Sequence, residues 1–372
     1  MNGSIRVGNL FGIPFYINVS WFIVLALMTL SYGGSLAAQF PQLGLGLPFL
    51  LGLIAALLLF ASVLAHELGH SVVAIKQGIN VKSISLFLFG GLASLDQEAK
   101  TPAGAFWIAI AGPLVSLFLF VGLTLMGSYL PLAAPLTALI NLLAYVNLAL
   151  AIFNLIPGLP LDGGNILKAL IWKITGNQFK GIVFASRVGQ GFGWLAILLG
   201  FLPLFAGGSI NFWTILIGWF LLSNAGILAK DATLRNQLSQ FTAEDALADN
   251  NSIVPQEISL RTFVNDYIIG KTATRQFLVT NEAGELVGQI SGDDLKTIPT
   301  SQWPLIQVQT VMQPVEFSTT VDAKQPLLDV VTVLEQQQLN ELPVVRNGVL
   351  VGLIEKASIR RLLEQRLQAN PA

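Results

Sequence analysis

The sequence contains no cysteine, few charged residues and only two histidines. Without cysteine, disulfide frameworks, thiolate catalysis and cysteine-ligated metal sites are all excluded. Charged residues make up 11% of the 372 residues, whereas an ordinary soluble domain carries about 25%. The net charge of -1 gives no indication of nucleic-acid binding, so no nucleic-acid partner is expected. Hydrophobic residues, in contrast, account for 53% of the chain, which indicates a membrane protein.

The few charged residues are concentrated in the last third of the chain. Residues 1–230 hold 9 of the 20 lysines and arginines and only 4 of the 21 acids. A transmembrane helix needs about 20 apolar residues to cross roughly 30 Å of hydrocarbon. Stretches of this length lie at about 14–32, 46–74, 103–126, 136–156, 190–206 and 210–228. We therefore expect a polytopic all-α membrane domain of about six transmembrane helices over residues 1–230, a polar linker over 231–245 and a soluble domain beyond it.

The basic residues of the membrane part fall in alternate connections between the expected spans. The connections 33–45, 127–135 and 207–209 carry no charge, and the lysines and arginines all lie in the other connections or at the two ends of this part. Because cytoplasmic loops carry an excess of lysine and arginine, both termini and the soluble domain are expected in the cytoplasm. The chain is thus predicted to be a multi-pass protein of the cell membrane.

The two histidines lie together in LAHELGHSVV, residues 64–73, inside the second expected span. His66 and His70 are four residues apart, so on a helix they share one face and both can reach one metal ion. Glu67 lies beside the first of them, where it can accept a proton from a metal-activated water. This is the H-E-x-x-H pattern of zinc metalloproteases. The structural alternative is two packed histidines beside a stray glutamate.

A catalytic zinc ion usually takes three protein ligands, and the third can be a carboxylate. Asp162 is the acid near membrane depth besides Glu67, in NLIPGLPLDGG over residues 154–164. The prolines and glycine before it are expected to end the preceding helix, and irregular backbone at such depth is tolerated where it lines a cavity. Asp162 is therefore the candidate third ligand. Its structural alternative is an N-cap of the helix that follows.

The segment VKSISLFLFGGLASL, residues 81–95, alternates polar and apolar residues and contains two glycines. That pattern predicts a β-hairpin between the second and third spans. An edge strand of such a hairpin could pair with an extended substrate. The hairpin could equally serve only as a plug of the cytoplasmic mouth.

These motifs together resemble the site-2 protease family of intramembrane zinc metalloproteases. The resemblance rests on HELGH, on Asn154, Pro157, Asp162 and Gly163 in a later N-x-x-P-x-x-x-x-D-G, and on FGG (89–91) and AGPLVS (111–116). It implies one Zn²⁺ per chain held by His66, His70 and Asp162, with Glu67 as general base. It also implies that Asn154 helps to hold the substrate or its oxyanion. The expected partner is a single-span membrane protein, such as a membrane-anchored transcription regulator or anti-sigma factor.

The polar C-terminal part contains an internal repeat. LVGQI at 286–290 recurs as LVGLI at 350–354, and a short strand precedes each copy. Repeats over 246–305 and 306–372 resemble a CBS-domain pair, a soluble α/β module that would regulate the protease and could form a homodimer. The CBS nucleotide pattern matches Ser291 and Asp294 in the first copy, which implies an adenine nucleotide there, whereas the second copy departs from it. The alternative is an adaptor or dimerisation module without a ligand.

A second function class also fits the composition, a CBS-regulated metal transporter or channel whose histidines bind the transported ion. A transport pathway should place polar groups across the bilayer and often shows repeated halves. Here the polar groups of the membrane part cluster at one depth, and its spans show no obvious repeat. A catalytically inactive chaperone is disfavoured because Glu67 and all three candidate ligands are present.

Overall fold

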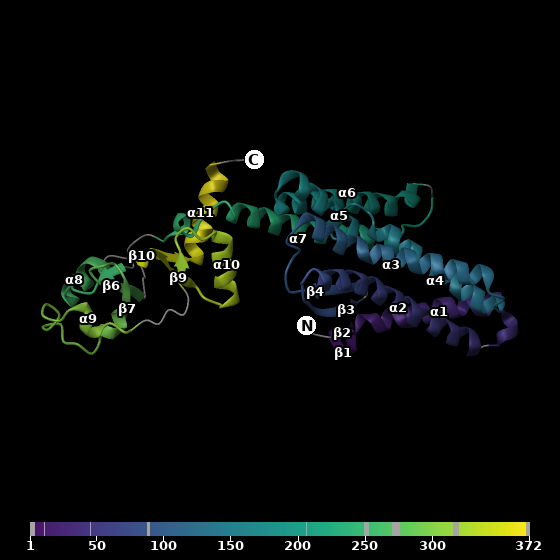
Figure 1. Ribbon diagram of the computed structural model, residues 1–372, viewed down its shortest axis with the longest axis horizontal. Helices are drawn as coiled ribbons and strands as arrows, with labels where there is room; N and C mark the ends of the chain where they lie inside the picture. The colour runs from purple at the N-terminus through teal and green to yellow at the C-terminus, as the bar shows by residue number, and fades with distance from the viewer. Residues whose placement is uncertain are drawn as a thin grey trace. The chain divides into compact units, whose positions relative to one another are not determined.

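The computed structural model describes residues 4–10, 12–44, 46–87, 90–205, 207–248, 253–269, 276–314 and 320–369 (Figure 1). The chain divides into two compact units, Met1–Thr233 and Leu234–Ala372. The first unit is mainly helical and holds the candidate metal ligands. The second unit is an α/β unit built from two small sheets.

Six of the described helices are long and apolar enough to cross a membrane. They are α1 (Ser20–Gln39), α2 (Gly46–Lys76), α3 (Pro102–Tyr129), α4 (Ala134–Asn154), α6 (Gln178–Phe205) and α7 (Phe212–Leu238). A helix satisfies every backbone hydrogen-bonding group within the segment, which hydrocarbon requires. The expectation of six transmembrane helices, and of a multi-pass membrane protein, is confirmed.

Two of the expected span boundaries were wrong. The first span was expected from about residue 14, but Ile13–Asn18 forms a strand, β2, and α1 begins only at Ser20. The strand is as apolar as the helix that follows, so hydropathy alone does not separate them. The fifth span was expected from about residue 190, but α6, the helix that contains it, begins at Gln178, and its first turns carry Lys180 and Arg187.

A four-stranded sheet lies at one end of the helices in the first unit. Its order is β1-β2-β3-β4, with β1 at Ser4–Leu10, β2 at Ile13–Asn18, β3 at Val81–Phe87 and β4 at Gly90–Leu95. Strands β3 and β4 pair antiparallel, as the predicted hairpin requires. Strand β2 joins β3 in parallel, a pairing of distant segments that was not predicted. Strand β4 is at one edge of the sheet.

The sheet is anchored on the first two helices by apolar packing. Ile84 and Leu86 of β3 are almost fully buried and pack with Trp21 of α1 and Phe60 of α2. Full burial of one such side chain contributes about 1.5–3 kcal/mol to stability. This packing fixes β3, and therefore β4, close to the part of α2 that carries the histidines.

The break expected between the fourth span and Asp162 is present. Helix α4 ends at Asn154, and α5 (Asp162–Thr175) begins at Asp162 itself. The intervening backbone packs tightly, since a methyl group on Gly158, Gly164 or Gly189 would lie within 2.5 Å of a backbone atom of a neighbouring segment. The amide of Leu159 also donates to the carbonyl of Ala185 on α6, at 3.1 Å. The segment that delivers Asp162 is thus held by α6.

The second unit contains two sheets of the same topology, which the internal repeat predicted. Each has a parallel pair followed by an antiparallel pair. The strands are β5 (Ile253–Pro255), β6 (Gln276–Thr280) and β7 (Leu286–Ser291) in one sheet, and β8 (Val321–Asp322), β9 (Glu341–Arg346) and β10 (Val349–Glu355) in the other. The main helices are α8 (Leu260–Phe263), α9 (Val308–Val311), α10 (Leu327–Gln336) and α11 (Lys356–Ala369). The expected α/β class is confirmed.

The two repeats exchange the segments at which they begin. Ala243, just before the first repeat, and Ala246, its first residue, are buried in the core of the second sheet. Val308, at the start of the second predicted repeat, is buried in the core of the first sheet. The linker expected over 231–245 therefore consists of the end of α7 at Leu238 and then a segment that belongs to a core.

Candidate metal centre

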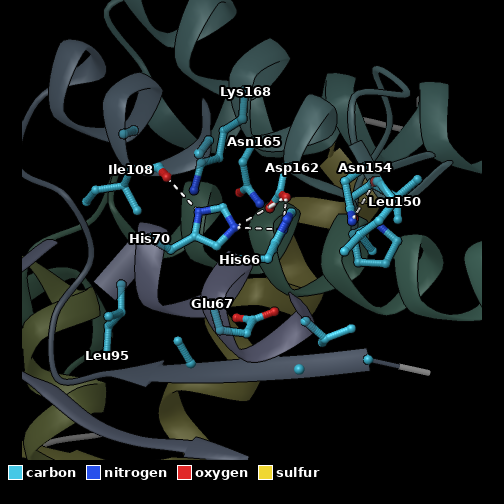
Figure 2. A pocket seen from close by; sticks show the side chains of 18 of the residues that line it. His66, Glu67, His70, Leu95, Ile108, Leu150, Asn154, Asp162, Asn165 and Lys168 are labelled. Atoms are coloured by element: carbon cyan, nitrogen blue, oxygen red, sulfur yellow. Dashed lines mark hydrogen bonds and ion pairs between the residues drawn. The ribbon is translucent and has the colours of Figure 1, made fainter. Parts of the chain in front are cut away.

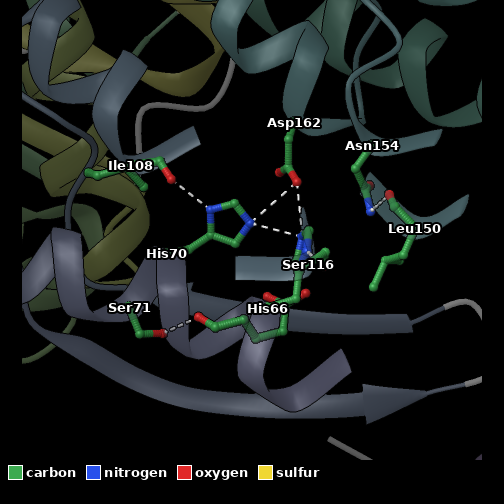
Figure 3. A network of polar contacts seen from close by, with 9 residues as sticks. His66, His70, Ser71, Ile108, Ser116, Leu150, Asn154 and Asp162 are labelled. Carbon is green, nitrogen blue, oxygen red and sulfur yellow. Dashed lines mark hydrogen bonds and ion pairs between the residues drawn. The ribbon is translucent and has the colours of Figure 1, made fainter. Parts of the chain in front are cut away.

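The two histidines of α2 meet the first side chain of α5. The Nε2 atoms of His66 and His70 lie 3.1 Å and 3.3 Å from the Oδ2 atom of Asp162 (Figure 3). The two Nε2 atoms lie 3.2 Å from one another. In the described part of the chain, these three residues form the group whose ligand atoms all lie within 4.8 Å. The structure thus brings together the three side chains expected to bind zinc.

Asp162 is the first residue of α5 and not its N-cap, which is Leu161. Its carboxylate contacts both histidines instead of a free amide of its own helix. This geometry disfavours the capping alternative for Asp162. Gly163 and Gly164, which follow it, allow α5 to begin close against the irregular segment after α4.

The outer ring nitrogens of both histidines are bonded to α3. His70 Nδ1 lies 2.6 Å from the carbonyl oxygen of Ile108, and His66 Nδ1 lies 2.9 Å from Ser116 Oγ (Figure 3). A carbonyl only accepts, so Nδ1 of His70 carries the hydrogen and Nε2 keeps its lone pair. Such hydrogen bonds orient metal-ligating imidazoles and fix their tautomer. Two imidazole nitrogens and one carboxylate oxygen fit a catalytic zinc ion with an open fourth position.

Helix α3 approaches the histidines very closely at Gly112. A methyl group there would lie 2.2 Å from Nε2 of His70 and 2.6 Å from Nε2 of His66. Ile108, Gly112 and Ser116 are spaced by four residues, so one face of α3 covers the pair. The AGPLVS motif therefore supplies both the close approach and the hydroxyl that bonds His66.

Glu67 lies on the side of α2 that faces the sheet. A methyl group on Gly91 of β4 would lie 2.3 Å from Glu67 Cγ, so glycine is needed for this approach. The carboxylate of Glu67 also faces the backbone amide of Ala93. Figure 2 shows Glu67 beside the two histidines, between the metal-ligand cluster and a strand. The expected base thus lies between the candidate metal ligands and β4.

One cavity of about 550 Å³ connects these groups. Its lining includes His66, Glu67, His70, Asp162, Gly91, Asn154, Asn165, Lys168, Glu98 and Asn224. A volume of this size suits a segment of a substrate, because ligand pockets usually measure about 300–1,000 Å³. The cavity is bordered by spans on one side and by β4 on the other.

The comparisons with known proteins identify the family. Residues 54–133 and 131–196 match the model of peptidase family M50. A Synechocystis protein named "Putative zinc metalloprotease sll0528" is 59% identical over 366 residues, which cover 98% of this chain and 96% of that relative. This chain belongs to peptidase family M50. It is therefore a zinc metalloprotease, and the transporter or channel alternative finds no support.

Other known proteins are similar to large parts of this chain. The protein named "Zinc metalloprotease MJ0392" of Methanocaldococcus jannaschii is 29% identical over 98% of this chain and 97% of its own length. The solved "Site-2 Protease from Methanocaldococcus jannaschii" is 30% identical, covers 61% of this chain and 95% of that chain, and superposes with a TM-score of 0.44. Residues 308–365 match the CBS domain model. The M50 protease thus carries a C-terminal CBS domain.

Asn154 lines the cavity of this M50 protease but does not contact the ligand cluster. It is the last residue of α4, and its Nδ2 atom donates to the carbonyl oxygen of Leu150 at 3.1 Å (Figure 2). A role in holding the substrate or its oxyanion would require this amide to leave its bond within the helix. That role remains a prediction.

The candidate nucleotide residues of the second unit are bonded to one another. The amide and the hydroxyl of Ser291 both donate to Asp294 Oδ2 at 2.7 Å. The other oxygen of Asp294 accepts from Gln313 Nε2, also at 2.7 Å. This arrangement caps the short turn Gly292–Leu295. A nucleotide bound through Ser291 and Asp294 would have to replace these internal hydrogen bonds with its own.

The sequence did not reveal that Ser116 and Gly112 contact the histidines or that Gly91 and Lys168 line the cavity. The motif AGPLVS contained a signal, the spacing of four between Gly112 and Ser116, but its partner helix was unknown. Gly91 was predicted only as part of the hairpin, and the structure places it in β4 against Glu67. Only the packing of α3 and β4 on α2 shows what these residues contact.

Proposed function

We propose that this M50 protease hydrolyses peptide bonds within or beside the transmembrane segments of its substrates. The observation that carries the proposal is the meeting of His66, His70 and Asp162 in one cavity with Glu67, among helices long enough to span a membrane. A single-span membrane protein, such as a membrane-anchored transcription regulator or anti-sigma factor, is the expected substrate class.

His66, His70 and Asp162 would hold one zinc ion through two nitrogens and one oxygen. When bound, zinc lowers the pKa of a coordinated water to about 7 and polarises a carbonyl group. The protein's part is to orient the imidazoles through Ser116 and Ile108 and to leave one side of the cluster open to the cavity.

Glu67 acts as the general base in this proposal. Its carboxylate accepts a proton from the attacking water and then delivers it to the nitrogen of the leaving amine. The position of Glu67 beside the ligand cluster and against Gly91 keeps the carboxylate on the side from which a substrate lying along β4 would enter.

A helical substrate must unwind before attack, because its carbonyl groups are bonded within the helix. The free edge of β4 offers hydrogen-bonding groups to an extended chain. Asp96, just beyond β4, donates its amide to Asn80 next to β3, so by alternation the amides of Ala93 and Leu95 point away from β3. The amide of Ala93 faces Glu67, so the amide of Leu95 is the donor that we expect to pair with a substrate. The alternative that the hairpin is only a plug stays open to the test below.

The CBS pair is proposed to act as a cytoplasmic regulator of access to the cavity. An adenine nucleotide held through Ser291 and Asp294 is the ligand to test, at most one per chain. Calorimetry on the full chain with AMP and ATP measures this directly. Heat that disappears in Asp294→Ala supports the site, and absence of heat with either nucleotide leaves a packing or dimerisation module.

The protease itself is tested by comparing Glu67→Gln with the wild type on a reconstituted single-span reporter. Cleavage should fall by at least about a hundredfold, the lower range for loss of a general base. Zinc content should stay near one per chain in Glu67→Gln, whereas Asp162→Ala, His66→Ala and His70→Ala should lose the metal. Full activity in Glu67→Gln would refute the proposed mechanism.

A further inference from the structure

One carboxylate at the border of the cavity is held by donors from two different helices. Glu98 lies in the irregular segment between β4 and α3. Its Oε2 atom lies 3.8 Å from Nζ of Lys168 on α5, and it also accepts a hydrogen bond from Nε2 of Gln178, the first residue of α6. The ammonium group of Lys168 and the side-chain amide of Gln178 thus together bind one carboxylate.

The two side chains of this ion pair differ in their exposure to solvent. The side chain of Lys168 is only 16% exposed, whereas that of Glu98 is 65% exposed. Helix α6 approaches α5 closely here, since a methyl group on Gly181 would lie 2.6 Å from the backbone carbonyl oxygen of Lys168. Figure 2 shows the lysine pointing from α5 into the cavity, on the side of His70. The cation is therefore part of the wall, and the acid reaches it from the more open side.

The ammonium group of Lys168 requires a negatively charged partner. Among the described residues that line the cavity, Lys168 is the one with a permanent positive charge, and Glu98 is the acid that pairs with it. An ammonium group largely removed from water is stabilised only while an opposite charge or several acceptors contact it. A substrate that displaces Glu98 must therefore supply a negative group of its own, or leave Lys168 unpaired.

We propose that Lys168 and Gln178 form a subsite for a carboxylate side chain of the substrate close to the scissile bond. Glu98 occupies this subsite in the free protein and competes with the substrate. The inference rests on the proposed function, because it names a feature of the substrate that the same cavity takes. The competing explanation is that the Glu98–Lys168 pair only ties the segment after β4 to α5.

The subsite predicts opposite effects for substitutions of Lys168 and Glu98, whereas a structural tie predicts the same loss for both. The experiment uses the full chain in proteoliposomes with a single-span reporter that the wild type cleaves and Glu67→Gln does not. Each reporter position near the cleavage site is changed in turn to Glu and to Gln, and kcat/KM is measured for both. The quantity compared is the ratio of kcat/KM for the Glu reporter to that for the Gln reporter at the most sensitive position.

The wild type should prefer the Glu reporter at one position. Lys168→Met should lower the ratio by about tenfold to near one, mainly through KM, because a partly buried charge pair is lost. Glu98→Gln should raise the ratio by about threefold, because the internal competitor is removed. Lys173→Met, which removes an exposed lysine of the same helix, should leave the ratio at the wild-type value.

Several outcomes would overturn the inference. Equal losses in Lys168→Met and Glu98→Gln, whatever the charge of the reporter, would show a structural tie. Cleavage by the wild type without preference for Glu at any position would remove the subsite. A Lys168→Met defect that follows the content of anionic lipid, and not the charge of the reporter, would assign the cation to lipid headgroups. Absence of cleavage by the wild type would refute the proposed function itself.

Discussion

Each candidate zinc-binding histidine has its outer ring nitrogen fixed by a residue of α3. Ile108 contributes a backbone carbonyl, which any residue at that position would provide. Ser116 contributes a side chain, is fully buried and contacts His66. Ser116 is therefore the residue at which the orientation of a ligand can be tested by substitution.

Ser116→Ala is expected to weaken zinc binding by about 10- to 100-fold, because the hydroxyl that orients His66 is removed. Zinc affinity is measured by competition with a chelator on the purified protein, independently of proteolysis. Ser71→Ala is the matched control, since Ser71 is equally buried on α2 but donates only to the backbone carbonyl of Glu67. Similar affinities for both variants would contradict the orienting role of Ser116.

Two glutamates of the second unit oppose each other across neighbouring strands. Glu341 of β9 is paired in register with Glu355 of β10. Burial, and then the charge of Glu355, raise the pKa of Glu341 above its ordinary value. A raised acid pKa in the folded state gives stability that is present at low pH and is lost as the pH rises through that pKa.

Glu341→Gln is therefore expected to stabilise the second unit at pH 7, by about 0.5 kcal/mol as for other cross-strand charge pairs. The gain should vanish below about pH 4, where glutamates are protonated in both states. Hydrogen exchange of the β9 and β10 amides in the full chain measures it locally. Glu335→Gln, on an exposed face of α10, should show no such pH-dependent gain. A gain independent of pH would rule out the charge explanation.

At the scale of elements, β4 is the strand that distinguishes the two interpretations of the hairpin. In one interpretation its edge pairs with the substrate, and in the other the hairpin only plugs the cytoplasmic mouth. Strand β4 lies at the edge of the four-stranded sheet and contacts Glu67 through Gly91. Because its alternate amides point away from β3, single backbone donors can be removed without opening the sheet. The hairpin packs on α2, the helix that carries the histidines, and this packing places β4 beside them.

Leu95→Pro is expected to slow cleavage by about tenfold while expression and zinc content stay near the wild-type level. The substitution removes an amide that points to the substrate side, worth about 1 kcal/mol when its partner is lost. Ser94→Pro is the comparison, because its amide points to β3 and its loss should reduce the amount of folded protein. Unchanged turnover in Leu95→Pro would favour the plug.

At the scale of the whole molecule, the distribution of basic residues predicts the orientation of the six spans. The connections without charge are expected outside, and the second unit is expected in the cytoplasm. The absence of native cysteine makes the test simple, since a single introduced cysteine is the one reactive thiol. The orientation matters for the proposed regulation, because the expected orientation would place the second unit where a cytoplasmic ligand could act on it.

Single cysteines at Ala38 and Leu130 should react with a membrane-impermeant reagent added to intact cells, whereas those at Thr175 and Gln240 should react only after lysis. The expectation follows from an even number of spans between the charged connections. Labelling of Thr175 from outside would show that the orientation or the number of spans is wrong.

The sequence by itself determined the features that depend on neighbours along the chain. The number of spans follows from runs of apolar residues, the hairpin over 81–95 from its alternation, and the metal-binding face of α2 from the spacing of His66 and His70. Asp162 could also be predicted, because few acids lie at membrane depth. These signals are local, and helix or strand periodicity decides them.

The tertiary structure alone decided the features that depend on contacts between distant segments. Ser116 and Gly112 gain their roles only because α3 packs on the histidines, and β2 is a strand because it pairs with β3. The exchange of segments between the two small sheets and the pairing of Lys168 with Glu98 likewise join residues far apart in the chain. Composition and periodicity carry no information on which surfaces meet, because that choice depends on the packing of the whole unit.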